Sequence, residues 1–232
     1  DHADKSRQIE ESCFDAVVFA NAYAAAQFEE INGIYLNPIR GQMNSLLLKE
    51  RAPLGASLCS EGYVAPARPL NNQWQLSFGA TFTLKQDPED LRTFEPRSRC
   101  TQKNLSTLAE LLGQPFVDEA IKNSELSARV SYRCATRDYL PLVGPVAKHD
   151  SLIERFAKLR KNKNARIEAS CPTYPHLYMN VGHGSRGLAY TPVCAEILAS
   201  LICGEPPPID DALYPHLHPA RFYIRDLTRN KL

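Results

Sequence analysis

The sequence of 232 residues has no long hydrophobic run, no surplus of charge of one sign and no regular cysteine spacing. No apolar stretch approaches the roughly 18 residues of a membrane-spanning helix, so we expect a soluble protein without a membrane partner. The net charge of +1 gives no general attraction to nucleic acid. The first residues include neither an initiator Met nor the apolar core of a signal peptide, which indicates a cut end of a longer protein.

The seven cysteines exclude two common roles. Their number is odd and no pair forms C-x-x-C, so neither a disulfide framework nor a zinc site is expected. Most lie in apolar surroundings, as small core residues do, and a reducing cytoplasm is the expected location. His216 and His218 lack a nearby Cys or acid to complete a metal site, so we expect no metal. The sequence also lacks a P-loop, a paired-carboxylate motif and a nucleophile–histidine set, which leaves hydrolase and kinase chemistry unsupported.

The most informative segment that is present is Asn180-Val-Gly-His-Gly-Ser-Arg-Gly-Leu188, which follows a short apolar run and opens onto a helical pattern. A strand, a Gly-rich turn and a helix present free N–H groups and a positive helix end to an electron-rich group. The spacing of Gly182, Gly184 and Gly187 matches a dinucleotide fingerprint, but that fingerprint needs a further strand ending in an acid. Here the Pro-rich segment 204–208 follows the helix instead, which favours a flavin ring carbonyl over a diphosphate. A purely structural turn remains the alternative.

The hydrophobic patterns predict a mixed α/β fold. The run 14–20 is typical of a strand buried on both faces, and 22–28 of a short helix. Strict alternation in 75–83 and 127–134 predicts strands with one buried face. Helical patterns cover 105–112, 116–121 and 152–159, and the last main helix places Val193, Ile197, Leu198, Leu201 and Ile202 on one side.

Arg133 is the sharpest candidate for chemistry. An Arg on the polar face of a strand can hold a carboxylate through two parallel hydrogen bonds, although a surface ion pair is the alternative. In the segment 37–43, Gly41 lets the backbone approach another group closely, while Arg40 and Gln42 offer donors; an ordinary turn is the alternative.

Two basic clusters stand out against the neutral total charge. The first contains Arg155, Lys158, Arg160, Lys161, Lys163 and Arg166, and the second contains Arg221, Arg225, Arg229 and Lys231. Basic side chains near a phosphate backbone add salt-sensitive affinity, so RNA contact and a solvated helix end are both open interpretations.

Three motifs together resemble a known family. Pro38-Ile-Arg-Gly-Gln42, Arg133-Cys-Ala-Thr-Arg-Asp-Tyr-Leu-Pro-Leu-Val-Gly144 and Gly182-His-Gly-Ser-Arg-Gly-Leu188 occur in this order in FAD-dependent amine oxidases of the D-amino-acid oxidase and glycine oxidase type. A narrower resemblance, to the C-terminal oxidoreductase half of bifunctional tRNA 5-methylaminomethyl-2-thiouridine biosynthesis enzymes, rests on the last of these motifs with Pro192-Val-Cys-Ala-Glu-Ile-Leu-Ala199, Gly204-Glu-Pro-Pro-Pro208 and Leu217-His-Pro-Ala-Arg-Phe222. The resemblance covers nearly the whole chain.

The resemblance implies a reaction and its partners. FAD would oxidise the carboxymethylaminomethyl group on the wobble uridine of tRNA, releasing glyoxylate, and a separate domain would methylate the amine with S-adenosylmethionine. Arg133 matches the residue that clamps the substrate carboxylate, and the turn with Gly184, Ser185, Arg186, Gly187 and Leu188 would contact the flavin. Arg40, Gly41 and Gln42 are expected cofactor contacts as well. The RNA contacts would be Arg155, Lys158, Arg160, Lys161 and Lys163.

The resemblance also implies a domain division. Residues 1–33 and 170–232 would form part of an FAD-binding, Rossmann-like domain, and 34–169 a substrate domain with an antiparallel sheet and flanking helices. The family's ADP-binding glycines and ribose-binding acid have no match here, so we expect this chain alone to bind FAD weakly or not at all and to be inactive. A free glycine or sarcosine oxidase and a non-catalytic RNA-binding module are the alternative functions.

Overall fold

The computed structural model describes residues 14–84 and 93–232. The chain divides into two compact units: unit 1 comprises Asp1–Asn37 and Cys134–Leu232, and unit 2 comprises Pro38–Arg133. Both units combine sheet and helix, which confirms the mixed α/β class. Residues 134–169, which the sequence suggested for the antiparallel substrate domain, pack in unit 1, because β8 (Leu142–Ala147) pairs with β9 (Thr173–Val181).

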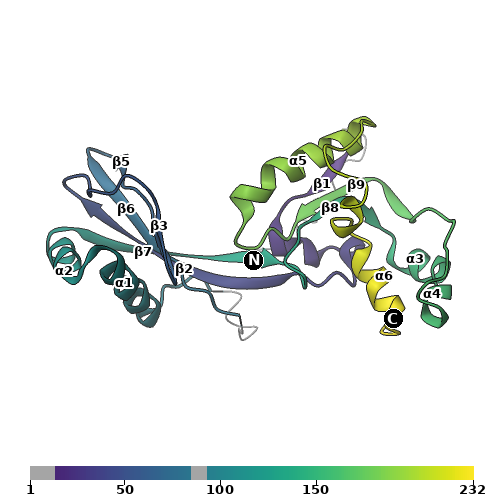
Figure 1. Ribbon diagram of the computed structural model, residues 1–232, viewed down its shortest axis with the longest axis horizontal. Coiled ribbons are helices and arrows are strands. Elements are labelled where there is room, and N and C mark those ends of the chain that lie inside the picture. Colours follow the sequence, from purple (N-terminus) through teal and green to yellow (C-terminus); the bar gives the residue numbers. More distant parts are fainter. Residues whose placement is uncertain (1–13, 85–92) are drawn as a thin grey trace, which may run out of the picture. The chain divides into compact units, whose positions relative to one another are not determined.

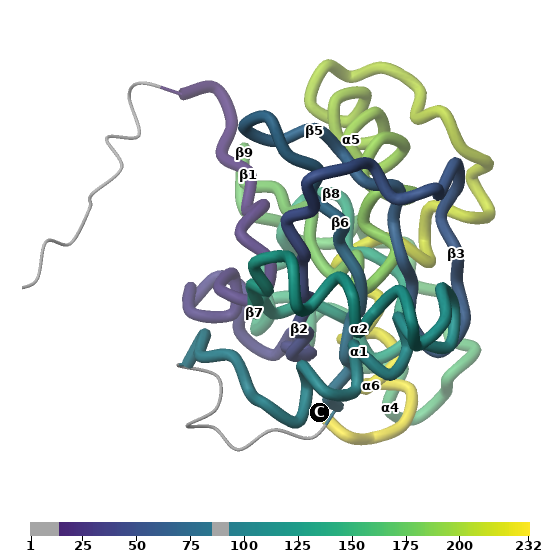
Figure 2. The backbone as a smooth tube through the Cα atoms, turned by 90° about the vertical axis from the view of Figure 1, so that its left-hand side faces the viewer, coloured from purple at the N-terminus to yellow at the C-terminus, as the bar shows by residue number. Residues whose placement is uncertain are grey.

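Unit 1 contains a three-stranded sheet in the order β1-β9-β8, in which β1 (Val17–Phe19) runs parallel to β9 and β8 runs antiparallel to it. Helix α5 (Gly187–Cys203) packs on one face of the β8–β9 pair through Val143, Cys194 and Ile197. Helix α6 (Arg221–Thr228) packs on the other face, where the main core of this unit lies. Figure 1 and Figure 2 show α5 and α6 on opposite sides of these strands.

The remaining elements of unit 1 are short. They are the 3-10 helices η2 (Ala22–Gln27), η3 (Glu29–Ile31) and η5 (Tyr214–His216), and the helices α3 (His149–Arg155) and α4 (Lys158–Lys161). The short helix expected over residues 22–28 is therefore present as a 3-10 helix.

Strand β1 corrects one expectation. The apolar run at 14–20 forms only three residues of strand, and this strand lies at the edge of its sheet. Phe19 is buried, but Val18 is 36% exposed and Phe14 is 64% exposed. The prediction of a strand buried on both faces was therefore wrong, because within the described residues the face that carries Val18 stays open to solvent.

Unit 2 is built on a larger, antiparallel sheet in the order β3-β4-β6-β2-β7, with β5 also paired to β6. Its strands are β2 (Asn37–Leu48), β3 (Leu58–Cys59), β4 (Tyr63–Val64), β5 (Arg68–Leu70), β6 (Gln73–Gly79) and β7 (Glu125–Ala135). Helices α1 (Ser98–Leu112) and α2 (Gln114–Asn123) lie side by side against this sheet (Figure 1). Leu46, Leu76, Phe78 and Leu108 form the centre of its core.

The alternating patterns were accurate where strands pair along their length. In β7, Val130, Tyr132 and Cys134 are buried while Arg129 and Ser131 are exposed, as the period of two predicts. In β6 the alternation holds through Phe78, but the strand ends at Gly79 and Phe82 is 46% exposed. The predicted strand was therefore too long at its C-terminal end.

The buried face of α5 also differs from the expectation. Ile197 and Leu198 are buried as predicted, but Cys194 and Ser200 are buried with them, and Val193 and Ile202 are each 39% exposed. Apolar residues surround this helix, so periodicity alone could not show which side faces the sheet.

None of the helices in the described ranges is long and apolar enough to span a membrane. Within the same ranges, no three His, Cys, Asp or Glu side chains are grouped so that they could hold a metal ion.

Candidate active site

The Gly-rich turn joins β9 to α5, as the sequence predicted. Gly182 has φ +84, and a Cβ there would lie 2.6 Å from Cγ2 of Thr136, so both backbone conformation and space require glycine. Gly184 has φ +58, and its N–H donates to the carbonyl oxygen of Cys134 at 2.7 Å. The turn is thereby attached to the C-terminal end of β7, with Ala135 and His183 forming an isolated bridge.

The start of α5 offers free hydrogen-bond donors. The N–H groups of Ala189 and Tyr190 both donate to the carbonyl oxygen of Arg186, but those of Gly187 and Leu188 have no acceptor among the described residues. Leu188 is 99% exposed, so nothing in the described part of the chain covers the turn there. Two free N–H groups at the positive end of a 17-residue helix fit an electron-rich oxygen.

Two charged or polar side chains flank these donors. Arg186 is fully exposed, and its Nη1 donates to the hydroxyl of Tyr190 at 3.1 Å, which raises the pKa of Arg186. His183 is half-buried, and its Nε2 has no hydrogen-bond partner among the described residues. Burial lowers the pKa of His183, so the imidazole is neutral at physiological pH. Ser185 is exposed between them.

Arg133 lies near the C-terminal end of β7 and is half-buried. Its Nη1 donates to the carbonyl oxygen of Thr81 at 3.2 Å, and its guanidinium carbon lies 5.6 Å from the centre of the Phe82 ring. Burial lowers the pKa of Arg133, an effect that the nearby Tyr63 opposes. No carboxylate in the described part of the chain pairs with this guanidinium, so the surface ion pair considered as the alternative is not formed there.

The side chains on either side of Gly41, those of Arg40 and Gln42, form hydrogen bonds within unit 2. Arg40 is fully buried; its Nη2 donates to the carbonyl oxygen of Glu95 at 2.6 Å and its Nη1 lies 3.8 Å from Sγ of Cys100. Gln42 is also fully buried, and its side-chain amide forms two hydrogen bonds with Arg97, the residue that precedes α1. Its Nε2 donates to the carbonyl oxygen of Arg97, and its Oε1 accepts from the N–H of Arg97. Their expected contact with a cofactor stays a prediction.

The first basic cluster is accessible. Its five residues Arg155, Lys158, Arg160, Lys161 and Lys163 belong to α3, α4 and the loop that follows, and all five are exposed. Apart from Arg155, whose Nη1 donates to the carbonyl oxygen of Ser170 at 3.1 Å, their charged groups have no hydrogen-bond or ion-pair partner within residues 14–84 and 93–232. A group of unpaired cations at the surface is free to contact phosphate.

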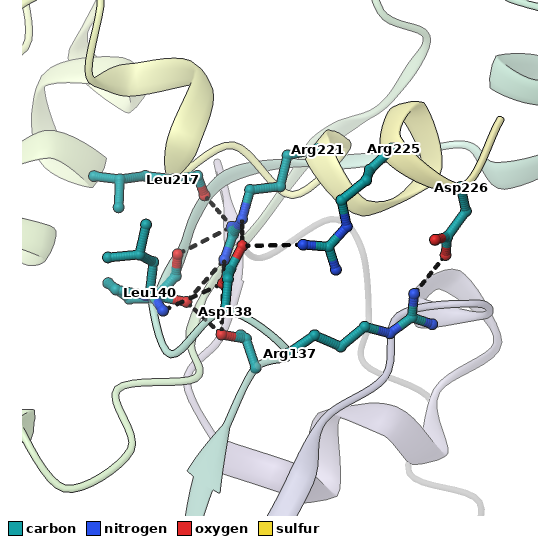
Figure 3. A network of polar contacts seen from close by, with 9 residues as sticks. Arg137, Asp138, Leu140, Leu217, Arg221, Arg225 and Asp226 are labelled. Carbon is teal, nitrogen blue, oxygen red and sulfur yellow. Dashed lines mark hydrogen bonds and ion pairs between the residues drawn. The ribbon is translucent and has the colours of Figure 1, made fainter. Parts of the chain in front are cut away.

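In the second basic cluster, Arg221 and Arg225 have an acidic partner, whereas Arg229 and Lys231 are exposed. Arg221 donates from Nε and Nη2 to the two carboxylate oxygens of Asp138, at 3.1 and 2.9 Å, and Arg225 lies 3.8 Å from the same carboxylate. Figure 3 shows the arginines of α6 reaching the loop at 136–141. Asp138 thus pairs with both arginines, and contact of this cluster with RNA phosphate stays a prediction.

The polar network around Asp138 also includes a second ion pair, and an aromatic ring lies beside it. Nη1 of Arg137 donates to Oδ2 of Asp226 at 2.6 Å (Figure 3). The guanidinium groups of Arg137, Arg221 and Arg225 all lie within 6 Å of the buried Phe222 ring. The sequence marked 133–144 as a motif but did not identify Asp138 as its anchor. The sequence signal that could have identified Asp138 was an acid two residues after Thr136. The hydroxyl of Thr136 and the N–H of Leu140 both donate to the carboxylate of Asp138.

The fold and the site together define a class of protein. The chain combines an α/β unit that carries a Gly-rich strand-to-helix turn with an antiparallel unit whose Arg133 has no carboxylate partner among the described residues. Residues 2–201 match the FAD dependent oxidoreductase family, DAO, and the chain belongs to that family.

The chain is similar to particular curated proteins as well as to the family model. The chain is 39% identical over 220 residues to the tRNA 5-methylaminomethyl-2-thiouridine biosynthesis bifunctional protein MnmC of Chromobacterium violaceum, and 38% identical over 221 residues to the protein of that name from Saccharophagus degradans. These alignments include 93% and 94% of this chain but 32% and 29% of the relatives. The chain thus spans about a third of the length of the curated relatives it matches.

Solved structures with the same fold are more distant in sequence. An iminodiacetate oxidase from a Chelativorans species superposes with a TM-score of 0.57 at 17% identity, over 89% of this chain and 46% of that one. A glycine oxidase from Geobacillus kaustophilus gives a TM-score of 0.55 at 18% identity, over 86% and 44% of the two chains.

Proposed function

We propose that this chain forms part of an FAD-dependent oxidoreductase that removes the carboxymethyl group from 5-carboxymethylaminomethyl uridine at the wobble position of tRNA. Arg133 carries the proposal, because a half-buried guanidinium with no carboxylate partner in the described chain is suited to bind the carboxylate of an N-substituted glycine. The names of the MnmC relatives support a tRNA substrate. A methyltransferase domain that uses S-adenosylmethionine completes the proposal for the whole enzyme.

We assign the flavin to unit 1 and the substrate carboxylate to unit 2. The free N–H groups of Gly187 and Leu188 are the donors that would hold an electron-rich edge of the flavin, and Gly184, Ser185 and Arg186 form the turn that would place them there. FAD, when bound, would supply the two-electron acceptor for oxidation of the carboxymethyl C–H, and water would then split the oxidised substrate into an aminomethyl group and glyoxylate. Arg133 orients the carboxymethyl group, which is a positioning contribution.

The substrate preference distinguishes this function from a free amino-acid oxidase. With the full-length, FAD-loaded enzyme, we expect kcat/KM for carboxymethylaminomethyl tRNA to exceed that for glycine or N-methylglycine by at least about 100-fold, because remote contacts to tRNA lower the barrier. Steady-state release of glyoxylate measures all three substrates. Efficient oxidation of free glycine without tRNA would favour the amino-acid oxidase.

The lysines of the first basic cluster provide a second prediction. Changing Lys158, Lys161 and Lys163 together to Gln is expected to weaken tRNA binding about tenfold. The slope of log affinity against log salt should also become shallower, by about 0.7 to 0.9 for each phosphate that the variant no longer neutralises. Filter binding of tRNA between low and moderate salt measures both quantities.

A triple variant of equal charge provides the control. Lys49, Lys103 and Lys122 are exposed lysines of unit 2, and their change to Gln is expected to leave the salt dependence unaltered. Equal losses from the two triple variants would mean that net charge, rather than this surface, attracts the tRNA.

A further inference from the structure

The guanidinium of Arg133 lies directly on the backbone of Gly41. A Cβ at position 41 would lie 2.3 Å from Nη1, 2.9 Å from Cζ and 3.0 Å from Nη2 of Arg133, and these are the three nearest heavy atoms. Real Cβ atoms do not approach other atoms so closely, so any side chain at this position would displace the guanidinium. The φ of Gly41 lies outside the left-handed region, so its backbone conformation does not by itself require glycine.

A second contact fixes the same end of Arg133. Nη1 donates to the carbonyl oxygen of Thr81, and Thr81 is buried at 5% exposure. The backbone of Gln42 holds Thr81 on two sides: its N–H donates to Oγ1 of Thr81 and its carbonyl oxygen accepts from the N–H of Thr81, both at 3.0 Å. The anchor for Nη1 is therefore itself rigid.

These contacts occupy one side of the guanidinium and leave the rest available. Nη2 and Nε of Arg133 have no hydrogen-bond partner among the described residues, while the Phe82 ring lies beside the group. An arginine binds a carboxylate through two parallel N–H groups only if its plane is held in the matching orientation. Gly41 and the Thr81 carbonyl together supply that restraint.

We propose that Gly41 is a positioning residue for substrate binding: the absence of its side chain seats the Arg133 guanidinium so that its free N–H groups meet the substrate carboxylate. The inference rests on the proposed function, in which Arg133 binds that carboxylate. It gives the Arg-Gly-Gln segment at 40–42 a specific task, with Gly41 making room for the guanidinium and Gln42 holding its anchor.

The substitution Gly41→Ala tests the inference. In the full-length enzyme we expect it to weaken binding of N-methylglycine, which carries the same carboxymethylamine group as the proposed substrate, by about 10-fold to 100-fold. Affinity is measured by NMR titration, which reports millimolar binding without turnover. Gly55→Ala is the matched control, because a Cβ at Gly55 has no heavy atom within 4 Å, and it is expected to change nothing.

A double-mutant cycle separates positioning from a general effect on the fold. In an Arg133→Ala background, Gly41→Ala is expected to cause no further loss of affinity, because the atoms that it would meet are gone. An equal loss in both backgrounds would overturn the inference. If Gly41→Ala alone does not fold, the double variant with Arg133→Ala is expected to fold; failure of both would also overturn it.

The cycle also distinguishes this inference from the proposed function. If Arg133→Ala leaves N-methylglycine affinity unchanged, the carboxylate role of Arg133 is wrong, and with it the proposed function. If Arg133→Ala abolishes binding while Gly41→Ala has wild-type affinity, the carboxylate role stands and the positioning role of Gly41 is overturned.

Discussion

Replacing Arg133 by alanine is expected to lower kcat/KM for carboxymethylaminomethyl tRNA by about 100-fold to 1000-fold. Removal of one partner of a desolvated, hydrogen-bonded charge pair costs about 2 to 5 kcal/mol, and each 1.4 kcal/mol is about tenfold in rate. Burial lowers the pKa of Arg133, but a guanidinium stays protonated at physiological pH and keeps its charge for the carboxylate. Glyoxylate release by the full-length, FAD-loaded enzyme measures the loss.

Two further variants define what is lost. Arg133→Lys keeps the charge but not the paired N–H groups, so we expect an activity between that of the wild type and that of the alanine variant. Arg129→Ala removes an exposed arginine from the same strand and is expected to have little effect. The affinity for tRNA should be unchanged in all three.

The result also decides between enzymatic and binding functions. Loss of turnover with tRNA affinity retained in Arg133→Ala excludes a non-catalytic RNA-binding module. Full turnover in this variant would remove the main support for the proposed function.

The substitution Asp138→Asn is expected to lower the free energy of unfolding by about 2 to 4 kcal/mol, because it leaves the charge of Arg221 uncompensated with a side chain that is 10% exposed. The carboxylate accepts hydrogen bonds from Arg221, Thr136 and the Leu140 N–H, and all of these are weakened together. Thermal unfolding should show a midpoint roughly 5 to 15 °C lower.

The pH dependence of this difference follows from the pKa of Asp138. Partial burial would raise the pKa, but hydrogen bonds and charge from Arg221, with smaller contributions from Leu140 and Thr136, outweigh it and hold the pKa below its ordinary value. A depressed carboxyl pKa stabilises the fold above the unfolded pKa, about 3.9, and that stabilisation is lost as pH falls through the folded pKa. The difference between wild type and Asp138→Asn should therefore be constant near neutral pH and shrink below about pH 4.

An exposed aspartate provides the control for Asp138. Asp211 lies in the same unit and is exposed, so Asp211→Asn is expected to change the free energy of unfolding by less than about 0.5 kcal/mol. If Asp138→Asn has no larger effect than Asp211→Asn, the network at α6 does not stabilise the fold.

The accuracy of the sequence predictions depended on how local the governing interactions are. The alternation in β7 identified its buried residues, because residues two apart in a strand face the same side whatever the strand pairs with. The burial of β1 and of α5 depends on which neighbours are present, so the prediction for β1 failed and that for α5 was right only at Ile197 and Leu198. The ion pairs of the α6 arginines could not be predicted from the sequence either, because their partner Asp138 belongs to another segment.

The order of residues along the chain was sufficient to predict the family, the mixed α/β class and the Gly-rich turn before α5, since each depends on residue types at fixed short spacing. Folding was needed to bring Gly41, Thr81 and Arg133 together, because these residues come from three separate segments of unit 2. The sequence identified Gly41 as a point of close approach without indicating what approaches. The tertiary structure identifies that group as the Arg133 guanidinium, since only the pairing of distant strands determines which side chain fills the space beside a glycine.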